Sequence, residues 1–398
     1  MPYPLNTGTK IRISHILQSL TQVARVDLVT YGDEQDLEDL KRSSCTYPGF
    51  WSYLNSIQFI SSPPWPEIEP DNYIRKISKS LFDGYGIIYS SFPMELMRER
   101  ITPLLRRADL IWTERLYLAT RLNEFCQKIV VDIDDLESVK IRRHASRQTN
   151  FYLRRMMIRE SNRLERTEKN SVERFLRLAV CSDEDRNLLG GVDDRLWVIP
   201  NGVGDDLMLK KEVHRDASKI IFVGTMYYEP NQDAVLYFCR DIFPIIKASI
   251  PDATFYIVGL KPPSVVTALH DGRDIFVCPD VPDVSPYVGS AAVSIVPLRI
   301  GGGTRLKILE SLAYGTPVVS TTIGAEGLDL QHDQHLMLAD TPDDFAYAVI
   351  KILRDSGFRN HLAATGKEQV RRKYLWSTIR DRLATDCQNL LQSNRENN

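Results

Sequence analysis

The sequence predicts an α/β protein built from two doubly wound domains of parallel sheet. Short apolar runs of strand composition alternate with helical or polar segments, as in repeated βαβ units. The 398 residues suffice for two domains with separate cores, and the Pro-Asn-Gly triplet at 200–202 marks a turn near mid-chain. We therefore predict a first domain at 1–204, a polar linker at 205–219, a second domain at 220–375 and a final helix at 376–398.

Composition narrows the possible functions. Hydrophobic and charged contents of 43% and 26% are those of a globular protein, and a net charge of -2 argues against a general nucleic-acid binder. The six cysteines are scattered without a CxxC pair, which suits a reducing compartment and offers no metal site. No apolar run approaches the roughly 20 residues that cross a bilayer. We expect a cytoplasmic protein without metal or cofactor, peripheral to a membrane at most.

The first domain contains a series of strand candidates separated by helical or polar segments. The segment PPWPEIEP at 63–70 reads as a stiff surface loop between two of them. The predicted strands lie at 25–31, 56–60, 86–90, 109–113, 128–133, 178–181 and 196–199.

Acidic residues follow the strand at 128–133, at the sheet edge where open α/β sheets hold ligands. A carboxylate from Asp134 or Asp135 could accept a proton from a substrate hydroxyl there. Asp135 or Ser138 could instead cap the next helix, and these alternatives stay open. Asp132 and Asp134 also spell DxD, a weak tripeptide match to metal–nucleotide sites.

A long basic helical stretch follows at 139–170. It holds ten Lys or Arg residues against three Glu, with Phe151, Tyr152, Met156 and Met157 interleaved. Most charge runs are solvated helix faces. The alternative is contact with anionic lipid head groups or with a pyrophosphate-linked acceptor.

The second domain is predicted to open with a buried strand at 220–224. A helix should run from the Pro-Asn pair at 230–231 towards 246, and two further units of a strand with its following loop are expected at 254–259 and 275–283. A helix at 343–354 follows later in the chain.

The stretch at 291–330 carries the strongest functional signal. A strand at 293–298 leads into three glycines, Gly301, Gly302 and Gly303, after which Thr304 stands where a helix N-cap would. A helix at 305–314 stops at Gly315 and Pro317, and a strand follows at 318–322. Glycines and a helix start favour an anion, and Arg305 and Lys307 add two cations. The alternative is a plain turn before a helix whose Arg and Lys are solvated.

These residues resemble the donor-binding segment of the group-1 (family-4) glycosyltransferases. The likeness rests on PLRIGGGTRLKILESLAYGTPVVST, IIFVGTMYYEPNQDAV, VIPNGV, GAEGL and YLWSTI. It covers the C-terminal half with specific motifs and the N-terminal half more weakly. Many relatives carry two glutamates separated by seven residues; Glu310 matches the second, whereas Gly302 occupies the first place.

The resemblance implies the GT-B fold, two Rossmann-like domains facing a central cleft, with the final helix crossing back to the first domain. It also implies retaining transfer from a nucleotide-diphosphate sugar in polysaccharide or glycolipid biosynthesis. No metal is needed if Arg305, Lys307 and the helix start neutralise the leaving diphosphate. Arg305 and Lys307 would hold the diphosphate, and Glu310 the ribose. Cations that relatives place after Gly224 are absent here, so Arg305 and Lys307 should do more of this task. The other implied donor contacts are Gly224, Thr225, Val281, Gly301, Gly302, Gly303 and Thr304.

On the acceptor side, the resemblance implies roles for Gly8, Thr9 and Arg12, and it places Asp134 and Asp135 where relatives carry a His-Asp pair. The acceptor would be a saccharide or a lipid-linked saccharide. Relatives have a strand before the Gly8 loop, so we expect a native form extended upstream by roughly one strand of 5–6 residues. Two alternatives remain: a sugar-nucleotide epimerase of the same fold, and a non-catalytic sugar-nucleotide-binding protein.

Overall fold

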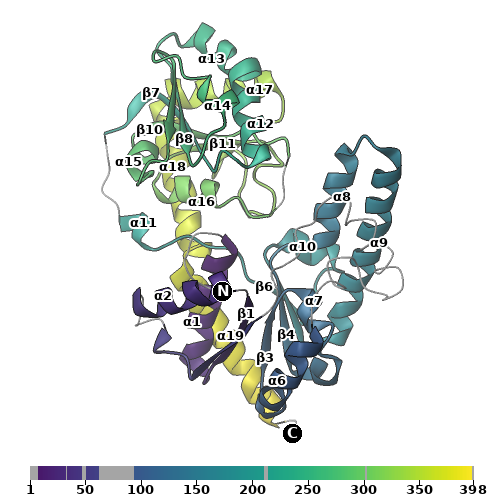
Figure 1. Ribbon diagram of the computed structural model, residues 1–398. Coiled ribbons are helices and arrows are strands. Elements are labelled where there is room, and N and C mark those ends of the chain that lie inside the picture. The colour runs from purple at the N-terminus through teal and green to yellow at the C-terminus, as the bar shows by residue number, and fades with distance from the viewer. Residues whose placement is uncertain are drawn as a thin grey trace. The chain divides into compact units, whose positions relative to one another are not determined.

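The computed structural model describes residues 8–32, 34–46, 51–61, 94–209, 214–300 and 303–396. The contacts between residues of the chain divide the protein into two compact units. The first consists of residues 1–200 with 379–398, and the second of residues 201–378. Both units are built on parallel sheets with helical connections, which confirms the predicted α/β class (Figure 1).

The second unit contains one six-stranded parallel sheet. Its order is β9-β8-β7-β10-β11-β12, so the first strand in the chain lies beside the fourth, and the order reverses between them. This is the order of a Rossmann sheet. Its strands are β7 (Asp216–Val223), β8 (Thr254–Gly259), β9 (Ile275–Pro279), β10 (Ala291–Val296), β11 (Val318–Ser320) and β12 (Met337–Leu338).

Every residue of β10 is buried, as expected for a strand covered on both faces by crossover helices. Phe222, Ile295, Leu309 and Phe345 belong to the main core of this unit. The helices are α11 (Asp206–Leu209), α12 (Glu229–Tyr237), α13 (Phe243–Ser249), α14 (Ser264–Thr267), α15 (Ser285–Gly289), α16 (Leu306–Ala313), α17 (Pro342–Arg354) and α18 (Ser356–Lys373).

The structure adds detail to two local predictions in this unit. The expected continuous helix from 230 to 246 is interrupted by a π-helical turn at Phe238–Ile242, immediately before α13. Pro244 lies in the first turn of α13 and cannot donate a backbone hydrogen bond, which explains the wider turn. The predicted linker is also partly ordered, because α11 lies within it and residues 216–219 form the first half of β7.

The described strands of the first unit form two parallel sheets. One pairs β1 (Asp27–Gly32) with β2 (Ser56–Ser61), and the other has the order β3-β4-β5-β6. The hydroxyl groups of Tyr31 and Tyr117 lie 2.7 Å apart and link the two sheets. The second sheet consists of β3 (Ile111–Glu114), β4 (Ile129–Ile133), β5 (Arg177–Val180) and β6 (Leu196–Val198). The strand predicted at 86–90 and the loop at 63–70 lie outside the described residues.

Helices flank these sheets, and the last helix of the chain, α19 (Trp376–Glu396), enters this unit at residue 379. Arg380 of α19 donates a hydrogen bond to Gln18 of α1. The other helices are α1 (Gly8–Val23), α2 (Glu34–Thr46), α6 (Met94–Arg107), α7 (Leu116–Ala119), α8 (Glu137–Arg147), α9 (Phe151–Arg174) and α10 (Asp183–Leu188), with a 3₁₀ turn at Asn123–Lys128.

The basic stretch at 139–170 is two helices rather than one. Helices α8 and α9 lie side by side as a hairpin (Figure 1), joined by residues 148–150. Asn150 caps α9, and its side chain accepts hydrogen bonds from the backbone of Tyr152 at 3.0 Å and Leu153 at 3.2 Å. An asparagine cap begins a new helix at this point and explains the break.

Candidate functional site

In the second unit, the sheet topology itself predicts where a ligand binds. In open α/β sheets, ligands bind beyond the carboxyl ends of the strands where the strand order reverses, which is between β7 and β10 here. Gly224 follows β7 directly, and the loop at 297–305 follows β10. The predicted glycine loop and the residues Gly224 and Thr225 therefore come from the two strands at this point. Gly301 and Gly302 lie outside the described residues.

Gly224 is required by close packing. A Cβ atom at this position would lie 2.8 Å from Lys307 Nζ and 2.9 Å from Asn231 Nδ2. The neighbouring strand β8 also lies very close, because a Cβ atom on its last residue, Gly259, would lie 1.7 Å from the Gly224 carbonyl oxygen. These contacts bring the end of β7, the start of α12 and the start of α16 together at one point.

Lys307 lies at the centre of this arrangement. Its amino group donates to Asn231 Oδ1 at 2.8 Å and lies 4.2 Å from the centre of the Phe222 ring. Asn231 is fixed in turn by its bond to the Thr225 carbonyl oxygen at 2.9 Å. Among the residues that the structure describes, Lys307 forms no ion pair with a carboxylate. A desolvated cation without a counter-charge is what an anion-binding site requires.

The pKa shifts of Lys307 and Glu310 agree with the desolvated position of Lys307. Burial lowers the pKa of Lys307 to about 7, the charge of Arg305 acts in the same direction, and Glu310 opposes them. Burial also raises the pKa of Glu310, against the influence of Lys307. Both side chains lie on α16, three positions apart, and hence on neighbouring parts of one helix face.

Arg305 is 8% exposed and donates a hydrogen bond to the Gly303 carbonyl oxygen. It occupies the N-cap position of α16, which begins at Leu306, so the prediction of Thr304 as the cap was wrong. The Thr304 hydroxyl instead accepts a hydrogen bond from Asn201 at 3.4 Å. Gly303 has a φ of 78°, a left-handed conformation that favours glycine.

Val281 follows β9 and packs against a small cluster that includes Ile221 and Val258. It lies near the strand ends of β7 and β8. The preceding Asp280 has a φ of 51° and accepts a hydrogen bond from the backbone of Lys261 at 2.9 Å. The loops after β8 and β9 are therefore joined at this edge of the sheet.

In the first unit, a second cluster of polar residues lies at the carboxyl ends of β3 and β4. Asp134 is 7% exposed and accepts a hydrogen bond from Thr9 at 3.0 Å. Arg115 Nη2 lies 3.5 Å from the same carboxylate oxygen, and Cys181 donates to the other oxygen at 3.5 Å. Thr9 and Asp134, predicted from distant parts of the chain, are thus brought together.

Asp132 and Arg12 form a buried pair beneath this cluster. Both side chains are 0% exposed, and the guanidinium binds the carboxylate through Nε at 2.9 Å and Nη2 at 2.6 Å. Arg12 also donates to the Ile199 carbonyl oxygen at 2.8 Å. This geometry assigns Arg12 to the inside of the unit and leaves Asp132 no free carboxylate for the DxD metal site. Gly8, at the start of α1, is exposed.

Asp135 differs from Asp134 in its surroundings. It is paired with Lys140 at 3.0 Å, and both side chains are partly exposed. Neither Asp135 nor Ser138 caps α8, whose N-cap is Leu136 without a side-chain hydrogen bond. Ser138 instead donates to the buried Glu168 of α9 through both its backbone nitrogen, at 3.1 Å, and its hydroxyl.

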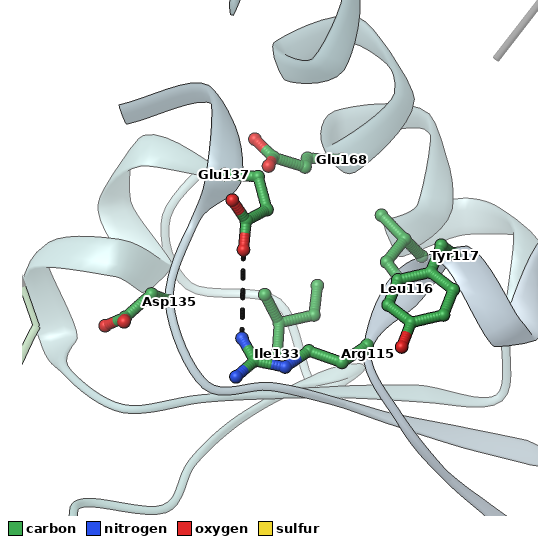
Figure 2. A pocket seen from close by; sticks show the side chains of 7 residues that line it. All are labelled: Arg115, Leu116, Tyr117, Ile133, Asp135, Glu137 and Glu168. Atoms are coloured by element: carbon green, nitrogen blue, oxygen red, sulfur yellow. Dashed lines mark ion pairs between the residues drawn. The ribbon is translucent and has the colours of Figure 1, made fainter. Parts of the chain in front are cut away.

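A pocket opens beside this cluster, lined by Asp135 and Glu137 together with residues that the sequence did not single out. Figure 2 shows Arg115 directed towards Glu137, at 3.8 Å. Arg115 adopts a φ of 74°, and its backbone donates to the Asp132 carbonyl oxygen at 2.9 Å. The remaining lining residues are Leu116, Tyr117, Ile133 and Glu168. No short motif marks Arg115; its position directly after a strand, at the sheet edge, was the available signal.

Glu114, next to Arg115, is a buried acid. Its two carboxylate oxygens are inaccessible and have no hydrogen-bond partner within the described residues. Burial, with the nearby charge of Asp132, raises the pKa of Glu114 well above its usual value. The buried site of Glu114 therefore favours the protonated, uncharged form of this side chain.

Comparison with known proteins identifies the second unit. Residues 217–355 match the family model described as glycosyl transferases group 1. These residues make up most of the second unit, which is therefore similar to a group 1 glycosyltransferase. The match includes the ends of β7 and β10, the glycine loop and α16, so it confirms the family resemblance on the residues that carried it.

Solved structures extend the likeness to nearly the whole chain. Sucrose-phosphate synthase from Thermosynechococcus elongatus matches with a TM-score of 0.66 and 16% identity, covering 97% of this chain and 94% of that chain. The Anabaena protein HepE, solved with UDP, matches with a TM-score of 0.62 and 12% identity, covering 94% and 96%. Structural similarity at so low a sequence identity is evidence about the fold alone. Here it confirms the predicted GT-B fold.

Among curated proteins, the phosphatidyl-myo-inositol mannosyltransferase of Mycobacterium leprae is 28% identical over 191 residues, which are 46% of this chain and 50% of that protein. The chain spans about half the length of the curated relatives it matches. No helix in the described ranges is long and apolar enough to cross a membrane.

Proposed function

We propose that this protein is a retaining glycosyltransferase that moves a sugar from a nucleotide-diphosphate sugar to an acceptor hydroxyl in polysaccharide or glycolipid biosynthesis. The observation that carries the proposal is the position of Arg305, Lys307 and Glu310 at the switch point of a group 1 glycosyltransferase domain. HepE, which shares the fold, binds UDP, and this supports a nucleoside diphosphate as the leaving group.

The chemistry follows from the residues present. Cleavage of the bond between the sugar and the diphosphate leaves negative charge on the diphosphate. Arg305, Lys307 and the start of α16 stabilise that charge in a desolvated setting, so the transfer needs no metal. Glu310, one turn into the helix, binds the ribose hydroxyl groups. Val281, Gly224 and Thr225 border the same donor.

On the acceptor side, Asp134 is the residue that we assign to the acceptor hydroxyl, as hydrogen-bond acceptor and proton acceptor. Thr9, Arg115 and Cys181 hold its carboxylate in place. The acceptor is a saccharide or a lipid-linked saccharide, and a relative named for phosphatidyl-myo-inositol supports a lipid-linked class. We place the reaction at the cytoplasmic side of a membrane, in keeping with the scattered cysteines of the sequence.

A binding and turnover experiment tests this proposal. A ligand at about 100 times its Kd stabilises a protein by about 2.7 kcal/mol, so a thermal-shift screen of nucleoside diphosphates and their sugars should identify the donor. Asp134→Asn should then lower turnover by about 100-fold or more while donor affinity stays at the parent value, because Asp134 belongs to the first unit.

Other outcomes would overturn the proposal. Hydrolysis or epimerisation of the donor without any acceptor would indicate the epimerase alternative. Donor binding with no turnover of any acceptor would indicate a non-catalytic sugar-nucleotide-binding protein. A loss of donor binding in Asp134→Asn, with the fold intact, would place Asp134 at the donor.

A further inference from the structure

The tip of the α8–α9 hairpin combines a concentration of arginines with exposed aromatic side chains. Between residues 143 and 159 the chain has five arginines and no acidic residue. The first turn of α9 also exposes two large rings: Phe151 is 66% exposed and Tyr152 is 76% exposed. We call residues 151, 152, 154, 155, 158 and 159 the tip surface.

The arginines of the tip surface are not neutralised. Arg154, Arg155 and Arg159 are exposed and form no ion pair with a carboxylate in the described parts of the chain. Further along the hairpin the situation differs: Arg142 binds Glu165 at 2.7 Å, and Lys169 binds the same glutamate at 2.8 Å. The positive charge is therefore concentrated at the end that carries the rings.

Helix periodicity places these side chains on one face. Phe151, Arg155 and Ile158 follow the spacing i, i+4, i+7, and Tyr152, Arg155 and Arg159 follow the spacing i, i+3, i+7. Ile158 is 39% exposed. The rings, the aliphatic side chain and the guanidinium groups thus form one mixed surface about two turns long.

The hairpin holds this surface in place. Arg142 of α8 donates to Ser161 at 3.2 Å and to Asn162 at 2.9 Å on α9, and Ser161 donates to the Ser138 carbonyl oxygen at 2.9 Å. Ala145 and Leu164 are buried between the helices. Figure 1 shows the two helices side by side along the length of α8. The tip surface is therefore formed before any partner arrives.

We propose that the tip surface binds an anionic lipid bilayer. Arginines next to exposed aromatic and aliphatic side chains on one helix face suit the interface of an anionic membrane, where guanidinium groups meet phosphates and the rings enter the head-group region. The whole chain has a net charge of -2, so attraction to a negative surface depends on this local concentration of charge.

The position of the hairpin gives the membrane contact a consequence for the reaction, and this part rests on the proposed function. Helix α8 begins at Glu137, directly after Asp134 and Asp135. Its 11 residues span about 16 Å at 1.5 Å per residue. The membrane would therefore lie within about 20 Å of the Asp134 loop along the hairpin, within reach of an acceptor sugar attached to a lipid through its head group.

Vesicle co-sedimentation tests the proposal on the full chain. The parent protein should bind vesicles containing anionic phosphatidylglycerol, bind neutral phosphatidylcholine vesicles weakly, and be released from the anionic vesicles at 0.5 M salt. Arg154→Gln, Arg155→Gln and Arg159→Gln combined should weaken anionic-vesicle binding by about 100-fold, since each charge contributes about fivefold. Phe151→Ser with Tyr152→Ser should weaken it by about tenfold.

A matched control comes from α6 in the same unit. Arg100, Arg106 and Arg107 are exposed arginines, and changing all three to Gln removes the same charge from a different surface. This control should bind anionic vesicles as the parent does. All changed residues are exposed, so thermal unfolding should stay at the parent midpoint.

Three results would overturn the proposal: no binding of the parent to anionic vesicles, equal weakening by the α6 control, or unchanged binding by the triple tip variant. Unchanged vesicle binding together with preferential binding to nucleic acid would assign the tip surface to that partner instead. Donor binding, measured by calorimetry on the same variants, should be unaffected by the substitutions in the tip surface. Its loss in the parent would contradict the proposed function and leave the membrane result standing.

Discussion

The charged side chains have opposite surroundings at two sheet edges, the carboxyl ends of β3 and β4 in the first unit and those of β7 and β10 in the second. In the first unit, Arg12 and Asp132 neutralise each other inside the protein, and Asp134 is surrounded by Thr9, Arg115 and Cys181. In the second unit, Lys307 contacts an amide and an aromatic ring, and its pKa falls to about 7. Under the proposed function, the first of these edges orients a neutral hydroxyl. An anionic ligand would supply the counter-charge that Lys307 lacks at the second.

The largest expected effect concerns the buried pair of the first unit. Arg12→Ala leaves the Asp132 carboxylate buried without its cation and should reduce the free energy of unfolding by about 3–5 kcal/mol. Arg12→Met combined with Asp132→Leu removes both charges and should recover most of this loss. Urea denaturation of the three variants measures it. A loss below 1 kcal/mol in Arg12→Ala would show that the pair is not a structural element of this edge.

The corresponding change in the second unit should affect binding rather than stability. Lys307→Met removes a desolvated cation that has no carboxylate partner in the described chain, so the free energy of unfolding should stay the same or rise. Nucleoside diphosphate affinity should fall roughly 10- to 150-fold, the value of one charge-assisted hydrogen bond. Destabilisation comparable to that of Arg12→Ala would remove the contrast between the two edges.

The pKa of Lys307 predicts a pH dependence. A bound diphosphate favours the charged amino group, whereas the free protein loses this proton above its pKa of about 7. Diphosphate affinity should therefore fall by about tenfold between pH 7 and pH 8.5, a range in which the phosphates are already ionised. Bare nucleoside should show no such trend, and Lys307→Met should abolish it. A flat profile in the parent would mean that the amino group stays charged without ligand.

A smaller effect should separate the two aspartates of the first edge. Asp135 pairs with Lys140 in a partly exposed position, and such pairs contribute about 1 kcal/mol or less. Asp135→Asn should therefore reduce turnover only a few-fold, against about 100-fold or more for Asp134→Asn. Steady-state kinetics with the identified donor compare them. Equal losses would assign the acceptor role to both residues.

Much of the fold could be predicted because the apolar runs at 128–133 and 293–298 indicate buried strands, which the structure has at 129–133 and 291–296. The helix breaks were missed for local reasons: an asparagine cap at Asn150 and a proline at 244 interrupt patterns that otherwise continue. The glycine loop and the cations after it could be recognised because the donor motif is contiguous in sequence.

The contacts at the carboxyl ends of β3 and β4 were harder to predict because they join residues that are far apart in the sequence. Thr9 and Asp134 are 125 positions apart, and Arg12 reaches Asp132 across 120 positions. Nothing in the local sequence distinguishes a buried, paired Arg12 from one that faces a substrate. Arg115 was missed for the same reason, since its role depends on a left-handed backbone conformation and on partners from α1 and the loop after β4.

Calorimetry with a nucleoside, its monophosphate and its diphosphate tests most directly whether the edge at β7 and β10 is the diphosphate site. Arg305→Ala should weaken diphosphate binding roughly 10- to 150-fold and leave bare nucleoside almost unchanged. Glu310→Gln keeps the side-chain shape and should weaken all three ligands alike, because they share the ribose. Equal diphosphate affinities in Arg305→Ala and the parent protein would contradict the account and remove this loop from the donor site.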